Sequence, residues 1–364
     1  MKVLSHILAI VVGALAAEGF TRATIEPDAI FEIAFSPGAQ SYDDELGMVY
    51  TPNFDGYMRH PDGVWAEPIH LDENGFRPFT RTGPDLPGDP TRVAIISGRS
   101  MTMCYGLPDE KTIQSFMVKE AKRALEVHNT GWAGIDPYRA WHFFLRTLDK
   151  GDPFDVALFA INPGSFAPYA TLPAGFEHVP RHPDADRFFY MMPGNIRMPK
   201  DALEDWMGPN YFRSYVLYGL LRYRQFPLEW WADAKRWVAK LRGEERAPAA
   251  EPVEDPAEIE LGKRRFAEFF LHMQRHFAKR GTRFGVVFLV SFKHPVDCYD
   301  DFAAAMPPGV PFIDLQKRLR PEMDPRNAVA LGHYGERQSR LVAEALNEFV
   351  DELLDMPVPE EGDE

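Results

Sequence analysis

The sequence predicts an α/β fold, a doubly wound parallel sheet of flavodoxin-like kind with additional segments. Five apolar segments of strand length alternate with segments of helical periodicity, the pattern of parallel strands joined by crossover helices. Two of them, Arg92–Ser97 and Asp155–Ile161, contain unbroken apolar runs, which are typical of strands buried on both faces. The 364 residues suffice for one large α/β domain with additions or for two modest domains.

The composition excludes several classes of protein. With 45% hydrophobic and 26% charged residues, the chain is globular rather than disordered. A net charge of −14 and the lack of a basic stripe argue against a nucleic-acid partner. Cys104 and Cys298 provide neither a disulfide framework nor a metal cluster; two buried thiols are favoured, although an oxidising compartment would allow pairing. No metal, P-loop or dinucleotide motif is present, so no cofactor is expected.

The N-terminal segment, residues 1–22, has the pattern of a signal peptide or membrane anchor. Lys2 precedes a mostly apolar run, Val3 to Ala17, which ends in small residues. Either form predicts export, with Lys2 on the cytoplasmic side and the body of the chain across the membrane. The alternative is an apolar helix packed on a cytosolic domain.

The chain after this segment divides into a prelude and the first part of the α/β domain. Residues 34–90 are rich in Pro, Gly and Asp with short alternating runs, which predicts a β-rich prelude. Residues 91–164 begin with the first strand, after which Gly98 allows a sharp turn, so Ser100 stands at the strand's carboxyl end. The other elements expected there are a helix over 110–125, a short strand from Val127, a helix over 138–148 and the strand Asp155–Ile161.

Residues 165–256 interrupt the α/β alternation and are predicted to form a helical insertion that ends in a linker over 243–256. This insertion holds four of the seven tryptophans and is either a cap over the active face or a small helical subdomain with its own core. Residues 257–355 then form the second part of the α/β domain, and residues 356–364 an acidic tail. The elements expected in the second part are a helix over 257–280, strands over 283–291 and 310–315, and an amphipathic helix over 337–354.

Two motifs resemble the SGNH/GDSL hydrolase family. Gly98-Arg99-Ser100 after a strand is similar to the family's first block, Gly-Asp-Ser. His333 lies ten residues before Ala343 in an Ala-Glu-Ala-Leu helix, as in the last block, and Asn129 lies five residues before Gly134, as in the second. The prelude motif Leu46 to Pro52, followed by Asn74-Gly-Phe-Arg77, resembles that of envelope-associated bacterial members.

The chain departs from the family pattern at three positions. Arg99 replaces the first-block aspartate, and Ala330 stands where the aspartate that orients the histidine belongs. Gly164 occupies the position of the third-block asparagine, with Asn162 two residues early. Loss of the orienting carboxylate in a Ser-His-Asp triad lowers the rate roughly 10⁴-fold, so Ala330 at this position predicts a large loss of activity unless another group orients the histidine. Arg99 would either assist an oxyanion or an acidic substrate, or block the site by pairing with a carboxylate.

The resemblance implies an SGNH hydrolase fold and two alternative functions. The first is a serine esterase or O-acyltransferase acting on acyl esters of a cell-envelope glycan, or on a small ester, in the periplasm or anchored in the inner membrane through the N-terminal segment. Ser100 is then the nucleophile, His333 the base, and Gly134 with the Ser100 amide the oxyanion donors, Asn162 being a weaker one. The second is an inactive relative that binds a glycan or a membrane complex. Taken singly, Ser100 also suits a helix cap and His333 a loop.

Overall fold

The computed structural model describes part of the chain: residues 6, 12–13, 15–17, 19, 39–43, 45–59, 66–81, 86, 88–132, 135–180, 190–192, 196–198, 255–292, 297–324, 328 and 333–357. Contacts group the chain into two compact units. One, here called the α/β unit, comprises residues 49–58, 66–181 and 254–364. The other comprises residues 1–48, 59–65 and 182–253.

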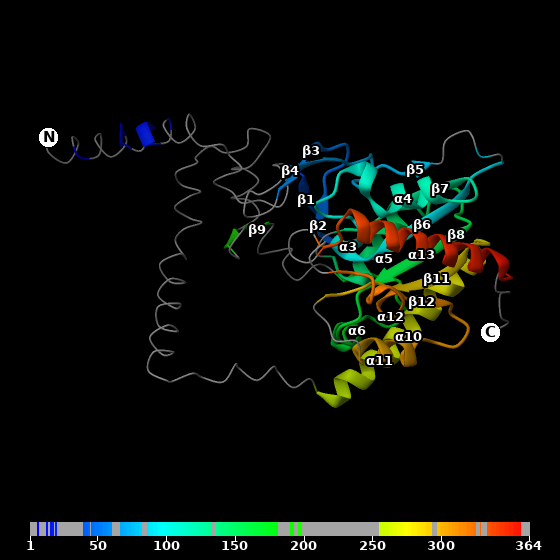
Figure 1. The fold of residues 1–364 in the computed structure, drawn as a ribbon. Helices are drawn as coiled ribbons and strands as arrows, with labels where there is room; N and C mark the ends of the chain where they lie inside the picture. Colours follow the sequence, from blue (N-terminus) through cyan, green and yellow to red (C-terminus); the bar gives the residue numbers. More distant parts are fainter. Residues whose placement is uncertain are drawn as a thin grey trace, which may run out of the picture. The chain divides into compact units, whose positions relative to one another are not determined.

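A six-stranded sheet forms the centre of the α/β unit (Figure 1). Its order is β12-β11-β8-β6-β7-β5; all neighbours are parallel except β5, which pairs antiparallel with β7. In chain order the five parallel strands run 2-1-3-4-5, so the connections wind outward in both directions from β6. The predicted α/β class with a mostly parallel sheet is confirmed. The strands are β5 (Thr80–Arg81), β6 (Thr91–Ser97), β7 (Leu125–Asn129), β8 (Val156–Ile161), β11 (Arg283–Phe288) and β12 (Phe312–Asp314).

Helices cover both faces of this sheet. Successive strand residues point to opposite sides, and both sets are apolar here, so each face must be buried. Val93 and Ile95 of β6 belong to one core cluster, and Ala94 and Ile96 to the other. The first cluster, which we call the aliphatic face, is mostly Val, Ile, Leu and Met and includes α4 (Ile113–Glu120), α12 (Leu315–Leu319) and α13 (Glu336–Asp355). The second, the aromatic face, is mostly Phe, Tyr and Trp and includes α5 (Pro137–Thr147), α10 (Pro256–Lys279) and α11 (Asp297–Ala305).

The helices begin where local sequence signals place them. Asp136 accepts a hydrogen bond from the backbone N–H of Arg139, and Asp255 accepts one from Ala257; each aspartate is followed by a proline at the first helical position. Both features are favourable at a helix N-terminus, where the first N–H groups lack intrahelical partners. The helices predicted over 138–148, 257–280 and 337–354 are therefore present within one or two residues.

One helix is shorter than predicted. The helix expected over 110–125 is a 3₁₀ turn, η1 (Asp109–Lys111), followed by α4, which ends at Glu120. Ala121 is already extended. Leu125, the last residue of the predicted helix, is buried and instead opens β7, where it pairs with Thr91. Residues 121–124 form the connection between α4 and β7.

The predicted prelude contains strands β1 (Gln40–Asp43), β2 (Gly47–Tyr50), β3 (Asp55–Arg59) and β4 (Ala66–His70), paired as β1 with β2 and β3 with β4. It also supplies β5 to the edge of the main sheet. Within the insertion, α6 (Ala167–Ala170) and an antiparallel pair, β9 (Tyr190–Met192) and β10 (Ile196–Met198), are described. Residues 199–254, which include the four tryptophans of the insertion, lie outside the described residues.

The predicted N-terminal segment also lies largely outside the described residues. None of the helices that the structure describes combines the length and the apolar character needed to cross a bilayer.

Candidate active site

Ser100 lies in a tight turn at the carboxyl end of β6. The turn leads directly into the four-residue helix α3 (Arg99–Thr102). Three successive residues have positive φ: Ser97 at 66°, Gly98 at 80° and Arg99 at 55°. For the two non-glycine residues this left-handed conformation costs free energy, and surrounding contacts must maintain it.

Thr102 and two glycines maintain this turn. The Thr102 hydroxyl contacts the carbonyl oxygen of Ser97 and lies 3.2 Å from that of Arg99. A Cβ at Gly98 would overlap the Thr102 side chain, and a Cβ at Gly131 would overlap both Thr102 and the backbone of Met103. Gly131 therefore allows the loop after β7 to pack directly against α3, which fixes the position of Ser100.

Asn129, the last residue of β7, connects the turn to its neighbours. Its side-chain amide donates to the carbonyl of Thr102 at 2.6 Å and to Oε1 of Gln114 at 2.8 Å, while its Oδ1 accepts from the N–H of Gly131 at 2.9 Å. The side chain is buried. These bonds join β7, α3, α4 and the Gly131 loop, so Asn129 holds the Ser100 turn in place rather than facing a substrate.

His333 meets Ser100 although the two are 233 positions apart. Its Nε2 lies 2.7 Å from Oγ of Ser100, a hydrogen-bond distance. The next residue, Tyr334, is buried and donates its hydroxyl to the carbonyl of Val290 beyond β11 at 2.8 Å. Gln338 in the first turn of α13 bonds the N–H of Gly335 at 2.8 Å. The histidine is therefore held between the sheet and the start of a long helix.

Tyr105 packs against the imidazole. The two ring centroids are 5.0 Å apart at 52°. Tyr105 is buried, and burial raises the pKa of its phenol to about 12, so it stays neutral at physiological pH. A neutral aromatic ring here restricts imidazole rotation and lowers the local dielectric around the Ser100–His333 pair.

The other predicted site residues have different outcomes. Gly134 and Ala330 lie outside the described residues. Asn162 directly follows β8, beside β6, and its amide oxygen is buried with no hydrogen-bond partner in the part of the chain that the structure describes. Its role as an oxyanion donor stays a prediction. Gly164 is exposed.

Arg99 is exposed, and its side chain forms no ion pair with any carboxylate among the described residues. The alternative in which Arg99 blocks the site by pairing thus finds no support in that part of the chain.

Two carboxylates lie near His333 in the sequence, Asp324 and Glu336. Glu336 pairs with Lys111 at 2.9 Å. The backbone carbonyl of Asp324 accepts from the Gln338 amide at 2.9 Å.

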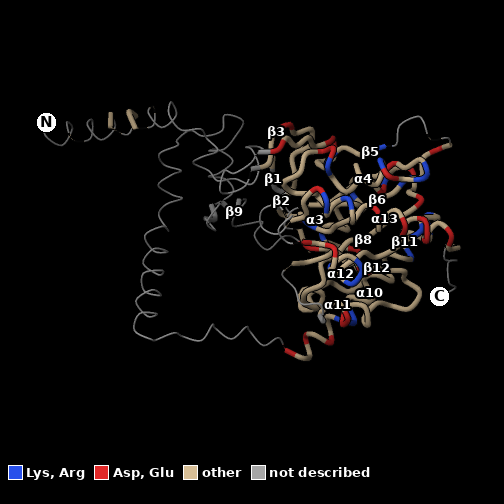
Figure 2. Tube along the Cα trace, in the orientation of Figure 1, with Lys and Arg blue, Asp and Glu red and all other residues tan. Residues whose placement is uncertain are grey.

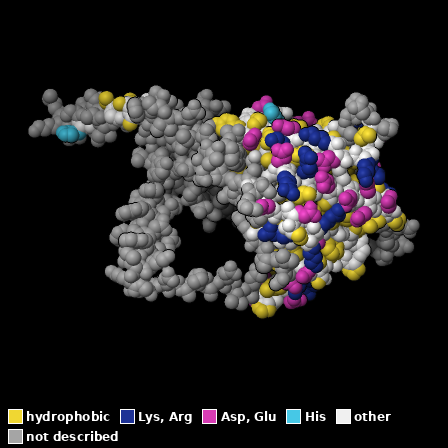
Figure 3. All heavy atoms as spheres, in the orientation of Figure 1, with side chains coloured by type: hydrophobic (Ala, Val, Ile, Leu, Met, Phe, Trp, Pro, Cys, Tyr) yellow, Lys and Arg dark blue, Asp and Glu magenta, His cyan; other side chains and the backbone are white. Residues whose placement is uncertain are grey.

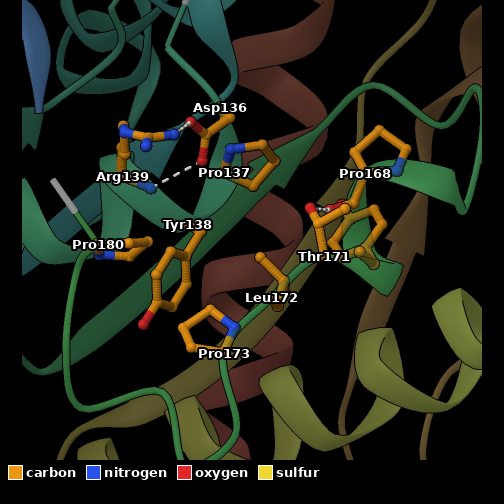
Figure 4. A pocket seen from close by; sticks show the side chains of 10 residues that line it. Asp136, Pro137, Tyr138, Arg139, Pro168, Thr171, Leu172, Pro173 and Pro180 are labelled. Carbon is orange, nitrogen blue, oxygen red and sulfur yellow. Dashed lines mark hydrogen bonds and ion pairs between the residues drawn. The ribbon is translucent and has the colours of Figure 1, made fainter. Parts of the chain in front are cut away.

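A cavity of about 240 Å³ opens at the same edge of the sheet (Figure 4). It is bounded by the start of α5, which follows β7, and by the segment that follows β8. Asp136 and Arg139 form an ion pair of 2.6 Å at one side, as the dashed line in Figure 4 marks. Tyr138, Leu172 and several prolines form much of the remaining wall.

Charge on the α/β unit is mixed. Acidic and basic residues alternate along its helices and loops (Figure 2), and their side chains intermingle on the face drawn in Figure 3. The described residues contain no group of three or more His, Cys, Asp or Glu side chains placed to hold a metal ion. Among the described residues, the reactive side chains that the structure brings together are those of Ser100 and His333.

Cys104 and Cys298 form no disulfide with each other. Cys104 is buried below the Ser100 turn, where its sulfur accepts from the N–H of Ile113 at 3.2 Å. Burial raises the pKa of this thiol to about 11, so it is not a nucleophile at neutral pH. Cys298 is half-buried and contacts the carbonyl of Pro163 at 3.8 Å.

Sequence reasoning missed Gly131, Thr102 and Tyr105 as parts of the site. A signal existed for the first, because a glycine two residues after a strand at the carboxyl edge marks a close backbone approach. No known protein family matches the sequence, and no characterised protein matches it significantly.

Proposed function

We propose that the chain is a serine ester hydrolase or O-acyltransferase of the SGNH-like kind, acting on acyl esters of a cell-envelope glycan. The observation that carries this proposal is the 2.7 Å contact between Oγ of Ser100 and Nε2 of His333. An acyl-transfer serine requires a base within this distance. The 2-1-3-4-5 strand order and the Gly98-Arg99-Ser100 motif support the SGNH-like fold.

The reaction follows from the geometry. His333 accepts the Ser100 proton as the hydroxyl oxygen attacks the ester carbonyl, and returns it to the departing alcohol. The acyl-serine then reacts with water in a hydrolase, or with a second alcohol in a transferase. The first N–H groups of α3 have no intrahelical partners, so the Ser100 amide suits the developing oxyanion. Gly134 and Asn162 are the further proposed donors.

The glycan, the export and the envelope location come from the resemblance and the N-terminal pattern. The second function, an inactive relative that binds a glycan or a membrane complex, rests on Arg99, Ala330 and Gly164. A single histidine–serine hydrogen bond is expected in either case, so activity must be measured.

The test uses the purified full-length chain in detergent. Hydrolysis of 4-nitrophenyl acetate and labelling by a fluorophosphonate, which reacts with activated serines, are compared between the parent, Ser100→Ala and Ser165→Ala. Ser165 follows the neighbouring strand β8 and serves as the matched control. We expect Ser100→Ala to lose at least about 10³-fold in rate and all labelling, and Ser165→Ala to retain both.

Equal rates for the parent and Ser100→Ala, or a parent that the fluorophosphonate does not label, would overturn the catalytic proposal in favour of the binding protein. Addition of a sugar alcohol to the active parent separates the two enzymatic forms. A transferase yields the acylated sugar, whereas a hydrolase yields free acetate alone.

A further inference from the structure

The cavity of Figure 4 is lined by no predicted site residue, but the segments that form it follow the two strands beside β6. Its walls come from the segments after β7 and β8, and these two strands flank β6, which carries Ser100 at its end. Tyr169, in the wall, is buried, and burial raises its pKa; the positive charge of Arg99 lowers it and the negative charge of Asp136 raises it. Arg99 therefore acts electrostatically on the cavity from the residue next to the nucleophile.

The size of the cavity limits its occupant. At about 240 Å³ it is smaller than the roughly 300–1,000 Å³ of pockets for drug-sized ligands. One six-membered ring with its substituents fits this space, and a short acyl chain fits it as well. A long lipid tail or several sugar residues do not.

The lining decides between these two occupants. Tyr138, Leu172 and the prolines present apolar surfaces, and the Asp136–Arg139 pair adds a carboxylate and a guanidinium at one side. A pyranose ring matches both parts, because its C–H face packs on apolar walls while its hydroxyls bond to the ion pair. An acyl chain would cover the ion pair without replacing its hydrogen bonds to water, which costs free energy.

The walls are also rigid, as a binding site requires. The Tyr138 hydroxyl donates to the carbonyl of His178 at 2.8 Å, and its ring packs edge-on against His142 at 4.6 Å. Tyr169 packs edge-on against Phe266 at 5.0 Å. Each wall tyrosine is thus fixed by the aromatic face, so little ordering cost remains at binding.

We propose that this cavity is a subsite for a single pyranose ring of the substrate, held by Asp136 and Arg139 against the Tyr138 and Leu172 walls. The inference rests on the proposed function for its place in the reaction, since the ring would be the alcohol part of the ester. Binding of the ring itself does not require catalysis.

The first experiment measures binding in Ser100→Ala, which removes the reaction. Saturation-transfer NMR is recorded with the methyl glycosides of glucose, galactose, mannose and N-acetylglucosamine, and with butyrate as the acyl probe. Each probe is tested against Thr171→Trp, which fills the cavity, and against Ala174→Trp in the same loop. Thr171 is exposed and lines the cavity, whereas Ala174 is also exposed but does not line it.

We expect at least one glycoside to bind, Thr171→Trp to abolish its signal and Ala174→Trp to preserve it. Binding of butyrate but of no glycoside would overturn the proposal and identify an acyl pocket. Absence of all binding, or a signal that survives Thr171→Trp, would also overturn it.

The second experiment separates failure of the subsite from failure of the proposed function. In the Ser100 background, Thr171→Trp should raise KM for an acetylated methyl glycoside about 10-fold or more and leave hydrolysis of ethyl acetate, which has no ring, within about twofold. If the parent cleaves neither ester, the proposed function fails, and the glycoside-binding experiment alone then tests the subsite proposal. If Thr171→Trp slows both esters equally, the subsite proposal fails while the enzyme stands.

Discussion

The two faces of the central sheet differ in composition and in their relation to the candidate site. The aliphatic face includes Met101 and Tyr334, which directly follow Ser100 and His333 in the sequence, and Cys104, four residues after Ser100. The aromatic face includes Tyr138 and Tyr169, which line the cavity. The segments that carry the nucleophile and the base are therefore anchored in the aliphatic core, and the tyrosines of the cavity wall in the aromatic core.

This difference has a physical reason. A proton transfer requires two side chains held at one distance. The aliphatic core provides a closely packed base for the Ser100 turn and the start of α13, and hydrogen bonds of Asn129 and Gln338 hold these two segments in place. A binding wall requires broad flat surfaces, which interlocking aromatic rings supply. Changes on the aliphatic side should alter the reaction of every ester, whereas changes on the aromatic side should alter stability and the recognition of the ring.

The largest effect is expected for His333→Gln. Glutamine retains a polar group near Oγ of Ser100 but cannot accept its proton as a base at neutral pH, so ester hydrolysis should fall by about 10³–10⁴-fold. The free energy of unfolding should change little, because His333 is only half-buried. Stopped-time ester assays and urea unfolding measure the two quantities. A rate within tenfold of the parent would exclude His333 as the base.

The reciprocal prediction concerns the aromatic face. Phe266 is fully buried and packs against Phe166, Tyr169, Phe270 and Phe302. Phe266→Ala should lower the free energy of unfolding by about 3–5 kcal/mol through lost burial and a cavity.

Phe312→Ala is the matched control for this change, since that ring is 38% exposed at the edge strand and should cost much less. Urea unfolding compares the two variants. At a temperature where both remain folded, kcat for ethyl acetate should match that of the parent. A selective loss of kcat in Phe266→Ala would show that the two faces are not separable.

Gly131→Ala should produce a smaller loss on the reaction side. The added methyl group overlaps Thr102 and Met103, so α3 and Ser100 must shift, and misplacement by about 1 Å costs roughly 10²-fold in kcat. Gly151→Ala is the control, because its added Cβ meets only the carbonyl of Leu148 at 3.7 Å. Kinetics on ethyl acetate compare the two. Equal kcat values would mean that the turn accommodates the methyl group.

The sequence predicted the sheet because period and apolar runs are local properties, and β6, β8 and α13 appear close to their expected bounds. Ser100 and His333 were found through two spaced motifs. The roles of Gly131 and Tyr105 in the site could not be predicted from the sequence, because they depend on contacts with segments that are distant in sequence or that fold back in a turn. The cavity could not be predicted for the same reason. It is formed by two segments that are separate in sequence, and their prolines and tyrosines do not by themselves indicate a ligand site.

The smallest effect should appear as a pH dependence of stability on the aromatic side. Burial lowers the pKa of His142 to about 4, while a backbone hydrogen bond to Phe176 opposes this and nearby His272 and His178 add to it. Burial, with a smaller contribution from His276, also lowers the pKa of His272. The His142 imidazole is therefore neutral in the folded protein at pH 6, whereas histidine in the unfolded chain has a pKa near 6.5.

Because the unfolded state then binds more protons, stability should fall as pH drops from about 6.5 toward 4. The loss due to His142 alone is on the order of 2 kcal/mol by pH 5. His142→Phe should flatten this slope, since phenylalanine does not titrate. Urea unfolding at pH 7, 6 and 5 measures the slope. An identical slope in His142→Phe would place the acid sensitivity outside the aromatic face and remove this distinction between the two sides of the sheet.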